Sequence, residues 1–358
     1  MRKRDGFFLA IAALAVSVVI WGNPITSLLT AFSSPPPPTL PIRSPSTRSS
    51  STRSLAANPL AALDLGVDGA QLISHIEMLA QPRATPAQKE AARRYIITQL
   101  TAYGLTPLAQ PYGDDTGGVN LIAELPGSDP TAGTVVLGAH YDTVENSPGA
   151  DDNGSAIATL LEAARLFSTD SAIARPLPAA LKLVFFDQEE QQPEGTGLLG
   201  SLAFTQQPDN IASVKGAVVL DMIGYACHTV GCQTYPLNLP LPDLPETGDF
   251  LAVLGLNSEP DMIDAFMLSA QSSSGPTIRT LPVPEPTLKL FPDLLRSDHV
   301  PFWDKGVPAV FVTDTANFRN PNYHTAQDTS ATLDRSFLSG SAQHVINAIA
   351  TLRNQPAP

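Results

Sequence analysis

The stretch Ser147-Pro148-Gly149-Ala150-Asp151-Asp152-Asn153-Gly154-Ser155 is an acidic turn punctuated by glycine. A His-Tyr-Asp sequence at residues 140–142 precedes it, and an Ala- and Leu-rich amphipathic run follows it. Two adjacent carboxylates repel each other unless positive charge lies close to both, and a metal ion supplies that charge more completely than the few basic side chains nearby. We therefore interpret this turn as one half of a metal site, placed between a strand and a helix.

Short apolar runs alternate with helical patterns along the rest of the chain. Runs with the composition of buried strands are residues 119–125, 134–139, 181–186, 217–220, 250–254 and 309–312. Apolar spacing and capping residues predict helices over residues 68–79, 86–103, 155–167, 197–204, 260–270 and 333–352. Such alternation is typical of helices packed on both faces of a sheet. We expect an α/β fold with a mixed, mostly parallel central sheet in a single globular domain, residues 60–358.

The composition narrows the range of partners. The chain has 358 residues, a formal net charge of −13 and 43% hydrophobic residues, which is ample for a full core. No basic stripe is present that could replace the counterions of a phosphate backbone, which argues against a nucleic-acid partner. The serine-nucleophile pattern Gly-x-Ser-x-Gly is also absent from the sequence.

The N-terminal region does not have the composition of a globular domain. Residues 2–4 are basic, residues 7–21 are uncharged and apolar, and Ala31-Phe32-Ser33 is an acceptable cleavage site. We expect residues 1–33 to be a signal peptide or, if the apolar run is retained, an N-terminal membrane anchor. Residues 34–59 are rich in Pro, Ser and Thr, which is typical of a disordered tether. The protein is therefore expected to be exported: secreted, periplasmic or tethered to the outer side of a membrane.

The two cysteines of the chain, Cys227 and Cys232, lie close together in the sequence. Their spacing matches neither a Cys-x-x-Cys motif nor a zinc-finger pattern. In an exported protein such a pair favours a disulfide that closes a small loop, and we expect one here.

Side chains that can bind metals follow several of the predicted strands. They are His140 with Asp142, Glu189 with Glu190, Asp221 and, from a later loop, His324. Each is weak evidence alone, since a lone histidine is more often structural and an aspartate at a strand end is as often a helix cap. Ligands, however, collect beyond the carboxyl ends of strands in open α/β sheets. The joint occurrence of these residues beside an acidic turn therefore predicts a metal centre.

The same motifs, taken in order, carry a resemblance to a known family. They are Gly138-Ala139-His140-Tyr141-Asp142, Pro148-Gly149-Ala150-Asp151-Asp152-Asn153-Gly154-Ser155, Glu189-Glu190, Leu220-Asp221-Met222, Ser297-Asp298-His299 and Tyr323-His324-Thr325-Ala326-Gln327-Asp328-Thr329. This set resembles the co-catalytic zinc exopeptidases, which include the bacterial secreted leucyl aminopeptidases, glutamate carboxypeptidase II and the glutaminyl cyclases. The resemblance covers roughly residue 119 to the C-terminus, and it implies that residues 60–358 form a zinc exopeptidase domain with an aminopeptidase-like fold.

The resemblance implies two zinc ions held by five ligands. These are His140 and Asp221 for one ion, Glu190 and His324 for the other, and Asp152 as a bridge. The peptide bond between Asp152 and Asn153 would be cis, as at the matching family position. Ala156 stands where many relatives have the last glycine of this motif, a small change at a helix start. Two imidazoles and three carboxylates also suit zinc chemically, with Mn²⁺ or Co²⁺ as possible substitutes.

The resemblance also assigns residues that act on the substrate. Glu189 would be the general base that takes a proton from the water shared by the ions and later passes it to the departing amine. Asp142 would fix the ring of His140. Tyr323 would either donate its hydroxyl to the oxyanion or form an aromatic wall. The pair Asp298-His299 would be further support for the ligands or a local helix cap.

The reaction implied is the removal of N-terminal residues from peptides or small aminoacyl substrates. An aminopeptidase of this kind buries an apolar first side chain close to the metals. Residues 224–290 are expected to form much of that pocket. Its apolar candidates are Tyr225, Phe250, Met262, Phe266 and Met267.

Three other functions fit the family less well. A carboxypeptidase would need arginines for the terminal carboxylate, and Arg279, Arg296 and Arg319 form no tight cluster in the sequence. A glutaminyl cyclase is a zinc acyltransferase that usually works with one ion and a tighter aromatic pocket, and it remains the alternative. A non-catalytic, receptor-like relative is disfavoured because every ligand and the base are retained.

Overall fold

The structure is a computed structural model that describes residues 65–114, 117–169, 177–190, 196–236 and 243–355. These residues belong to one compact unit, Leu55–Pro358. The predicted signal peptide or anchor and the predicted tether lie outside the described residues. Among the helices that the structure describes, none combines the length and the apolar character needed to cross a membrane.

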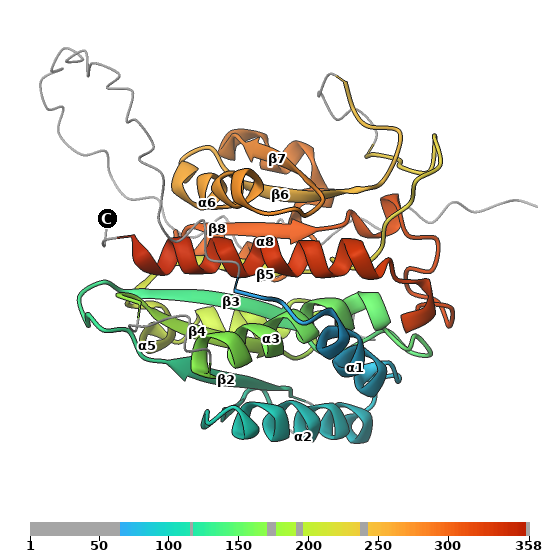
Figure 1. Ribbon diagram of the computed structural model, residues 1–358. Helices are drawn as coiled ribbons and strands as arrows, with labels where there is room; N and C mark the ends of the chain where they lie inside the picture. The colour runs from blue at the N-terminus through green and yellow to red at the C-terminus, as the bar shows by residue number, and fades with distance from the viewer. Residues whose placement is uncertain (1–64, 115–116, 170–176, 191–195, 237–242, 356–358) are drawn as a thin grey trace, which may run out of the picture. The chain divides into compact units, whose positions relative to one another are not determined.

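An eight-stranded sheet forms the centre of this unit, with the strand order β1-β2-β4-β3-β5-β8-β6-β7 (Figure 1). The strands are β1 Leu108–Pro111, β2 Val119–Leu125, β3 Thr134–His140, β4 Ala180–Phe186, β5 Val214–Leu220, β6 Phe250–Leu256, β7 Thr277–Val283 and β8 Ala309–Thr313. The four central strands, β4-β3-β5-β8, are parallel, and so are β6 and β7. The pairs β1-β2, β2-β4 and β6-β8 are antiparallel. The prediction of a mixed sheet with a parallel centre is confirmed.

Helices cover both faces of the sheet, and α3 and α8 run across its near side in Figure 1. The helices are α1 Gly69–Leu79, α2 Pro86–Ala102, α3 Ala156–Thr169, α4 Leu199–Thr205, α5 Pro208–Ile211, α6 Pro260–Ser272, α7 Val300–Asp304 and α8 Arg335–Asn354. Short 3-10 turns occupy Glu285–Leu290, Pro292–Leu295, Ala316–Phe318 and Ser330–Thr332. Alternate residues of β3 point to opposite faces. Val135 joins the core under α3 and α8, whereas Val136 joins a second core with Phe204 of α4 and Phe302 of α7.

Capping residues explain where several helices begin. The hydroxyl of Thr85 and the side chain of Gln88 form a capping box at the start of α2. The carboxylate of Asp334 accepts two backbone N–H groups, so α8 begins at Arg335 rather than at residue 333 as predicted. The starts of α2 and α8 thus follow the side chains that satisfy the first free N–H groups.

The sequence patterns missed β1 and β7, the two edge strands. Three of the four residues of β1 are exposed, and β7 contains an exposed proline, Pro282, among positions of mixed burial. An edge strand has a free side that tolerates proline, and its residues need not be apolar on both faces. Neither segment therefore has the continuous apolar run that identified the interior strands.

Candidate metal centre

Three neighbouring parallel strands bring four of the predicted site residues to one edge of the sheet. His140 is the last residue of β3, which lies between β4 and β5. Glu189 and Glu190 follow the end of β4, and Asp221 comes directly after β5. Because the carboxyl ends of parallel strands meet at one edge, side chains far apart in the sequence become neighbours.

The acidic turn forms a distorted helical turn, Ala150–Ser155, in which the Asp152–Asn153 peptide bond is cis. Gly149 begins it with a φ of 60°, and a Cβ at this position would lie 2.3 Å from the carbonyl oxygen of Asp152. The side-chain amide of Asn153 donates to the carbonyl of Leu220 (3.0 Å) and accepts the N–H of Met222 (3.1 Å). The turn is therefore fastened to the two residues on either side of Asp221.

The carboxylate of Asp328 also holds the acidic turn in place. Asp328 accepts the backbone N–H groups of Asp151 (2.9 Å) and Asp152 (3.0 Å). The Asp151 carboxylate itself accepts from the N–H of Gly224 (2.9 Å) and the amide of Asn320 (2.9 Å). Asp151 is thus occupied by the surrounding loops, and Asp152 is the carboxylate of the turn that faces the histidines.

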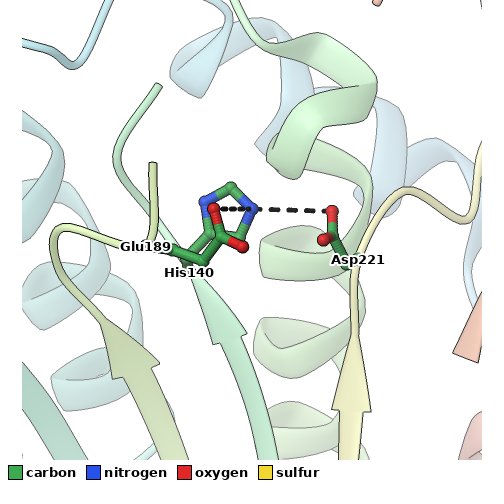
Figure 2. Close-up of side chains that lie close together, drawn as sticks. All are labelled: His140, Glu189 and Asp221. Carbon is green, nitrogen blue, oxygen red and sulfur yellow. Dashed lines mark ion pairs between the residues drawn. The ribbon is translucent and has the colours of Figure 1, made fainter. Parts of the chain in front are cut away.

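His140 lies among three carboxylates (Figure 2 shows two of them). Its Nε2 atom is 3.4 Å from Asp152 Oδ1, 3.5 Å from Asp221 Oδ1 and 3.9 Å from Glu189 Oε2. The donor atoms of His140, Glu189 and Asp221 all lie within 4.8 Å of one another, which is compatible with one ion. Geometry alone would allow Glu189 as a ligand, but it is the most distant of the three carboxylates.

His324 lies among a second set of carboxylates. Its Nε2 atom is 3.2 Å from Asp152 Oδ2 and 3.2 Å from Glu190 Oε2. The donor atoms of these three residues also lie within 4.8 Å of one another. Asp152 therefore presents one oxygen to His140 and the other to His324, which is the arrangement expected of a bridging carboxylate.

The charges in this cluster perturb one another strongly. Burial and the charge of Glu190 raise the pKa of Asp152 to about 7. Burial lowers the pKa of His324, but its hydrogen bonds with Asp152 and Glu190 raise it overall to about 10. For His140, burial also acts downward, and the charge of Glu189 with that of Asp221 raises the pKa well above its usual value. Bound protons thus offset the negative charge of the carboxylates wherever no cation does so.

The donor set fits zinc. Imidazole nitrogens and carboxylate oxygens are ligands that zinc takes at catalytic sites, where three protein ligands generally leave a position for water or substrate. Asp152, Glu190 and Asp221 place their negative charges around two histidines, and divalent cations would relieve their mutual repulsion. His140, Asp221, Glu190, His324 and Asp152 are the residues that would hold the metal.

Asp142 contacts both His140 and the loop that carries Glu189 and Glu190. Its carboxylate lies 3.7 Å from Nδ1 of His140, and the ring nitrogen is closer to the backbone carbonyl of Asp142, at 3.2 Å. The carboxylate instead accepts the backbone N–H groups of Glu189 (3.0 Å) and Glu190 (3.2 Å). Asp142 therefore orders the Glu189-Glu190 loop with its side chain, and both its carboxylate and its backbone carbonyl lie beside Nδ1 of His140.

Tyr323 forms part of the wall beside the second group. Its ring stacks on the imidazole of His324, with centroids 3.7 Å apart. Its hydroxyl oxygen accepts a hydrogen bond from Nη2 of Arg296 (3.0 Å). Since that oxygen is acting as an acceptor, the hydrogen of the phenol can be donated to a substrate.

The pair Asp298-His299 is buried and contributes no cap to a helix. Burial raises the pKa of the Asp298 carboxyl to about 7. Burial lowers the pKa of His299 to about 4, and its Nε2 atom lies 2.9 Å from the carbonyl of Leu294. Helix α7 begins directly after this pair, but the side chain of His299 forms no capping hydrogen bond. Of the two readings given to these residues, the local cap is therefore wrong.

A cavity of about 590 Å³ opens over the metal centre. Predicted site residues that line it are Asp152, Glu189, Glu190, Asp221, Tyr323 and His324. Its apolar wall includes Phe250, Ala252, Leu254, Leu281 and Phe311. A reacting bond held at the metal centre would therefore lie next to a surface that can bury an apolar side chain.

Only part of the predicted pocket wall is present. Phe250 lines the cavity, whereas Met262 and Phe266 belong to the core on the other face of the sheet. Met267 is 39% exposed. Helix α6 packs against β6 and α8, and its 3.6-residue period turns its apolar face into that core. The segment 224–290 does supply much of the wall, as predicted, but through the loop before β6 and through β6 and β7 rather than through α6. Strand β8 and the loops that follow β7 and β8 complete the wall.

The disulfide predicted between Cys227 and Cys232 is present. Cys227 also pairs through its backbone with Gly248, just before β6. The bond thus closes a small loop in the segment that leads from β5 toward the apolar wall of the cavity.

Helix α2 supplies basic residues that no sequence pattern had connected with the site. Asp187, which follows β4, pairs with Lys89 (2.8 Å) and Arg93 (3.4 Å). It also accepts the backbone N–H of Val119 (2.9 Å). These contacts fix the start of the loop that carries Glu189. They join residues 68 to 98 positions apart, and only the folded chain reveals them.

Comparison with known proteins gives a consistent result. The model of the family described as Peptidase family M28 matches residues 120–349. The uncharacterized protein YfbL of Escherichia coli (strain K12) is 31% identical over 250 residues, which cover 67% of this chain and 72% of that protein. Leucine aminopeptidase 1 of Ajellomyces capsulatus (strain NAm1 / WU24) is 37% identical over 144 residues. That match covers 38% of this chain and 35% of the fungal protein, about a third of its length.

Solved structures share the fold. LapB from Legionella pneumophila superposes with a TM-score of 0.64 at 18% identity, covering 83% of this chain and 75% of LapB. The zinc aminopeptidase BSAP from Bacillus subtilis gives a TM-score of 0.61 at 16% identity and covers 80% of this chain and 95% of BSAP. The glutaminyl cyclase of Porphyromonas gingivalis gives a TM-score of 0.57 at 20% identity, and the match covers 80% of this chain and 98% of the cyclase.

Proposed function

Because this chain belongs to peptidase family M28, we propose that it is a zinc-dependent aminopeptidase that hydrolyses N-terminal residues of peptides. One observation carries the proposal: the two oxygens of Asp152 lie 3.4 Å from Nε2 of His140 and 3.2 Å from Nε2 of His324. Each histidine also has a carboxylate of its own, Asp221 or Glu190. The residues thus offer places for two ions that share one ligand.

When bound, such ions would polarise the scissile carbonyl and lower the pKa of the attacking water molecule. Glu189 is the general base that accepts a proton from this water and donates it to the leaving amine. Burial and the nearby charges of Asp221 and Glu190 raise the pKa of Glu189, which suits a group that must both accept and release a proton. Asp142 holds the backbone of Glu189 in place.

The substrate is held by the cavity over the metal centre. Tyr323 donates its hydroxyl hydrogen to the oxyanion of the developing tetrahedral carbon, while Arg296 holds the phenol oxygen. The wall formed by Phe250, Leu254 and Phe311 buries the side chain of the first residue.

A panel of substrates tests this proposal. Aminoacyl anilides and short peptides with free amino termini are compared with the same peptides after N-acetylation and with C-terminally amidated versions. We expect release of the N-terminal residue only from free amino termini, no effect of amidation, loss of activity with a chelator and recovery with Zn²⁺. Equal hydrolysis of N-acetylated peptides, or activity that survives complete removal of metal, would overturn the proposal.

Glutaminyl cyclisation is the second candidate, because the glutaminyl cyclase of P. gingivalis shares the fold over 98% of its length. A peptide that begins with glutamine separates the two reactions. An aminopeptidase releases free glutamine, whereas a cyclase releases ammonia and leaves a peptide of unchanged length with a blocked terminus. Measuring both products in one reaction mixture decides between them.

A further inference from the structure

The loop between α1 and α2 buries an arginine beside the metal centre. The side chain of Arg83 is enclosed by the acidic turn and by the residues after β3, and the residue is only 2% exposed. Its guanidinium donates to five backbone carbonyls, those of Leu79, Gln81, Tyr141, Pro148 and Gly149. No carboxylate is among these acceptors.

Three of these carbonyls belong to the two segments that carry the proposed ligands. Nε of Arg83 donates to Tyr141 (2.6 Å), the residue directly after His140. Nη1 donates to Pro148 (2.9 Å) and Nη2 to Gly149 (2.9 Å), at the start of the turn that presents Asp152. A planar guanidinium with fixed donor directions thereby sets the distance between the two segments.

The packing around this contact leaves little freedom. A Cβ at Gly149 would lie 2.6 Å from Nη2 of Arg83 and 2.4 Å from the methyl carbon of Thr143. The hydroxyl of Thr143 in turn accepts the backbone N–H of Arg83 (2.9 Å). The arginine, the turn and the segment after β3 are therefore packed as one piece.

The charge of Arg83 acts against a metal rather than for it. Burial lowers its pKa to about 10, in spite of the favourable charges of Asp152 and Asp328, so the guanidinium is charged at neutral pH. A fixed positive charge near a cation site repels the cation. If charge were its main effect, removing Arg83 would strengthen zinc binding. If geometry were its main effect, removing it would weaken zinc binding.

We propose that Arg83 is a positioning residue of the metal centre: its guanidinium holds the His140 segment and the Asp152 turn at the spacing that the metal requires. The inference rests on the metal centre of the proposed function but not on the identity of the substrate. Residues that orient metal ligands through hydrogen bonds typically change metal affinity by about 10–100-fold when they are lost.

Two substitutions separate geometry from charge. Arg83→Lys keeps the charge and loses the planar donor set, whereas Arg83→Met loses both and keeps much of the volume. The apparent Zn²⁺ affinity of each full-length variant is measured by competition with a chromogenic chelator, and the absorption spectrum of the Co²⁺-loaded protein reports ligand geometry. We expect affinity to fall by about 10–100-fold in both variants, with an altered cobalt spectrum.

Arg353 provides a matched control. It is 3% exposed, donates from Nε to the carbonyl of Ala179 (3.0 Å) and lies over the ring of Phe167, and burial lowers its pKa to about 10 as well. Ala179 lies directly before β4, at the edge of the sheet opposite the metal centre. Arg353→Met should lose a similar buried guanidinium and keep the wild-type zinc affinity and cobalt spectrum.

The outcomes are distinct. Wild-type or tighter zinc binding by folded Arg83→Met overturns the inference, because charge would then outweigh geometry. If Arg83→Met does not fold, Arg83→Lys decides: unchanged affinity and cobalt spectrum in that variant overturn it. Equal losses in Arg83→Met and Arg353→Met also overturn it, since general destabilisation would explain both. A wild-type chain that binds no zinc would instead contradict the proposed function.

Discussion

Asp152 shows how a single residue can be chosen from a sequence motif and then explained by its contacts. The acidic turn contains two aspartates, and the family resemblance selected the second. In the structure Asp151 is bound by Gly224 and Asn320, whereas Asp152 faces both histidines. The hydrogen bonds around each carboxylate, rather than its charge, determine which one is available to a metal.

Glu189 and Glu190 are adjacent in the sequence, but their side chains lie in different groups of site residues. Glu190 lies 3.2 Å from His324, in the group with Asp152. Glu189 lies 3.9 Å from His140 in the other group, and both glutamates are fixed through their backbone by Asp142. This difference in surroundings is what the proposed role of Glu189 as general base requires.

Replacing Glu189 by Gln tests its role as general base. The amide keeps the shape of the side chain but cannot accept a proton at neutral pH, so kcat should fall by about 10²–10⁴-fold while the zinc content stays at the wild-type level. The measurements are steady-state kinetics on a free-amino peptide and metal analysis of the purified variant. Glu145→Gln, at an exposed position after β3, is the matched control and should leave both unchanged. Retained turnover in Glu189→Gln would remove this residue from the mechanism, and a loss of zinc would make it a ligand.

At the scale of elements, strands and helices were predicted most reliably where burial is complete. All seven residues of β3 are buried, so its apolar run needed no alternation to be recognised. β1 and β7 lack such a run because they are edge strands. Signals at helix starts were informative, as Asp68 before α1 and Pro86 in the first turn of α2 show.

The cap of α8 gives a prediction at this scale. Asp334 accepts the N–H groups of Ser336 and Phe337 (3.0 Å each), and it lies 3.0 Å from Nε2 of His228. Asp334→Ala should lower the free energy of unfolding by about 1 kcal/mol, measured by chemical denaturation. Asp334→Asn keeps a capping oxygen and should lose less than half of that. Equal losses in the two variants would mean that the charge, not the cap, stabilises the helix.

At the scale of the whole molecule, the metal centre joins parts of the chain that pack on different elements. Its proposed ligands come from β3, the acidic turn, the loops after β4 and β5, and the loop before α8. Bound zinc would connect all of these, so it should stabilise the folded chain as a unit. Removing it should leave the fold with a cluster of carboxylates that must take up protons.

Thermal unfolding should therefore depend on zinc and on pH together. Zinc must displace protons from His324, whose pKa is raised to about 10, and below about pH 7 also from Asp152, whose pKa is raised to about 7. The increase in Tm on adding Zn²⁺ should shrink as pH falls, and more steeply below about pH 7. The measurement is calorimetry of metal-free and zinc-loaded protein from about pH 5 to about pH 9, in steps of about one pH unit. A zinc-induced increase in Tm that does not change with pH would contradict the assignment of these ligands.

The sequence alone determined the type of fold and the chemical character of the site. Apolar runs and capping residues define the central strands and most helices because burial and hydrogen bonding act locally along the chain. The order of the motifs was sufficient for the family resemblance, which the match over residues 120–349 confirms. Side chains at the ends of parallel strands could be expected to meet, since the topology of such sheets leaves one edge for them.

Only the tertiary structure decided how the site is held together. Arg83 contacts both ligand segments, Asp142 orders the backbone of Glu189 and Glu190, and Asp187 pairs with Lys89 of α2. The apolar wall likewise comes from β6, β7 and β8 rather than from α6. The hydrogen bonds and the ion pair named here join residues 47 to 98 positions apart. Their partners are mostly backbone carbonyls and N–H groups, which every residue has, so no pattern of side chains in the sequence could identify them.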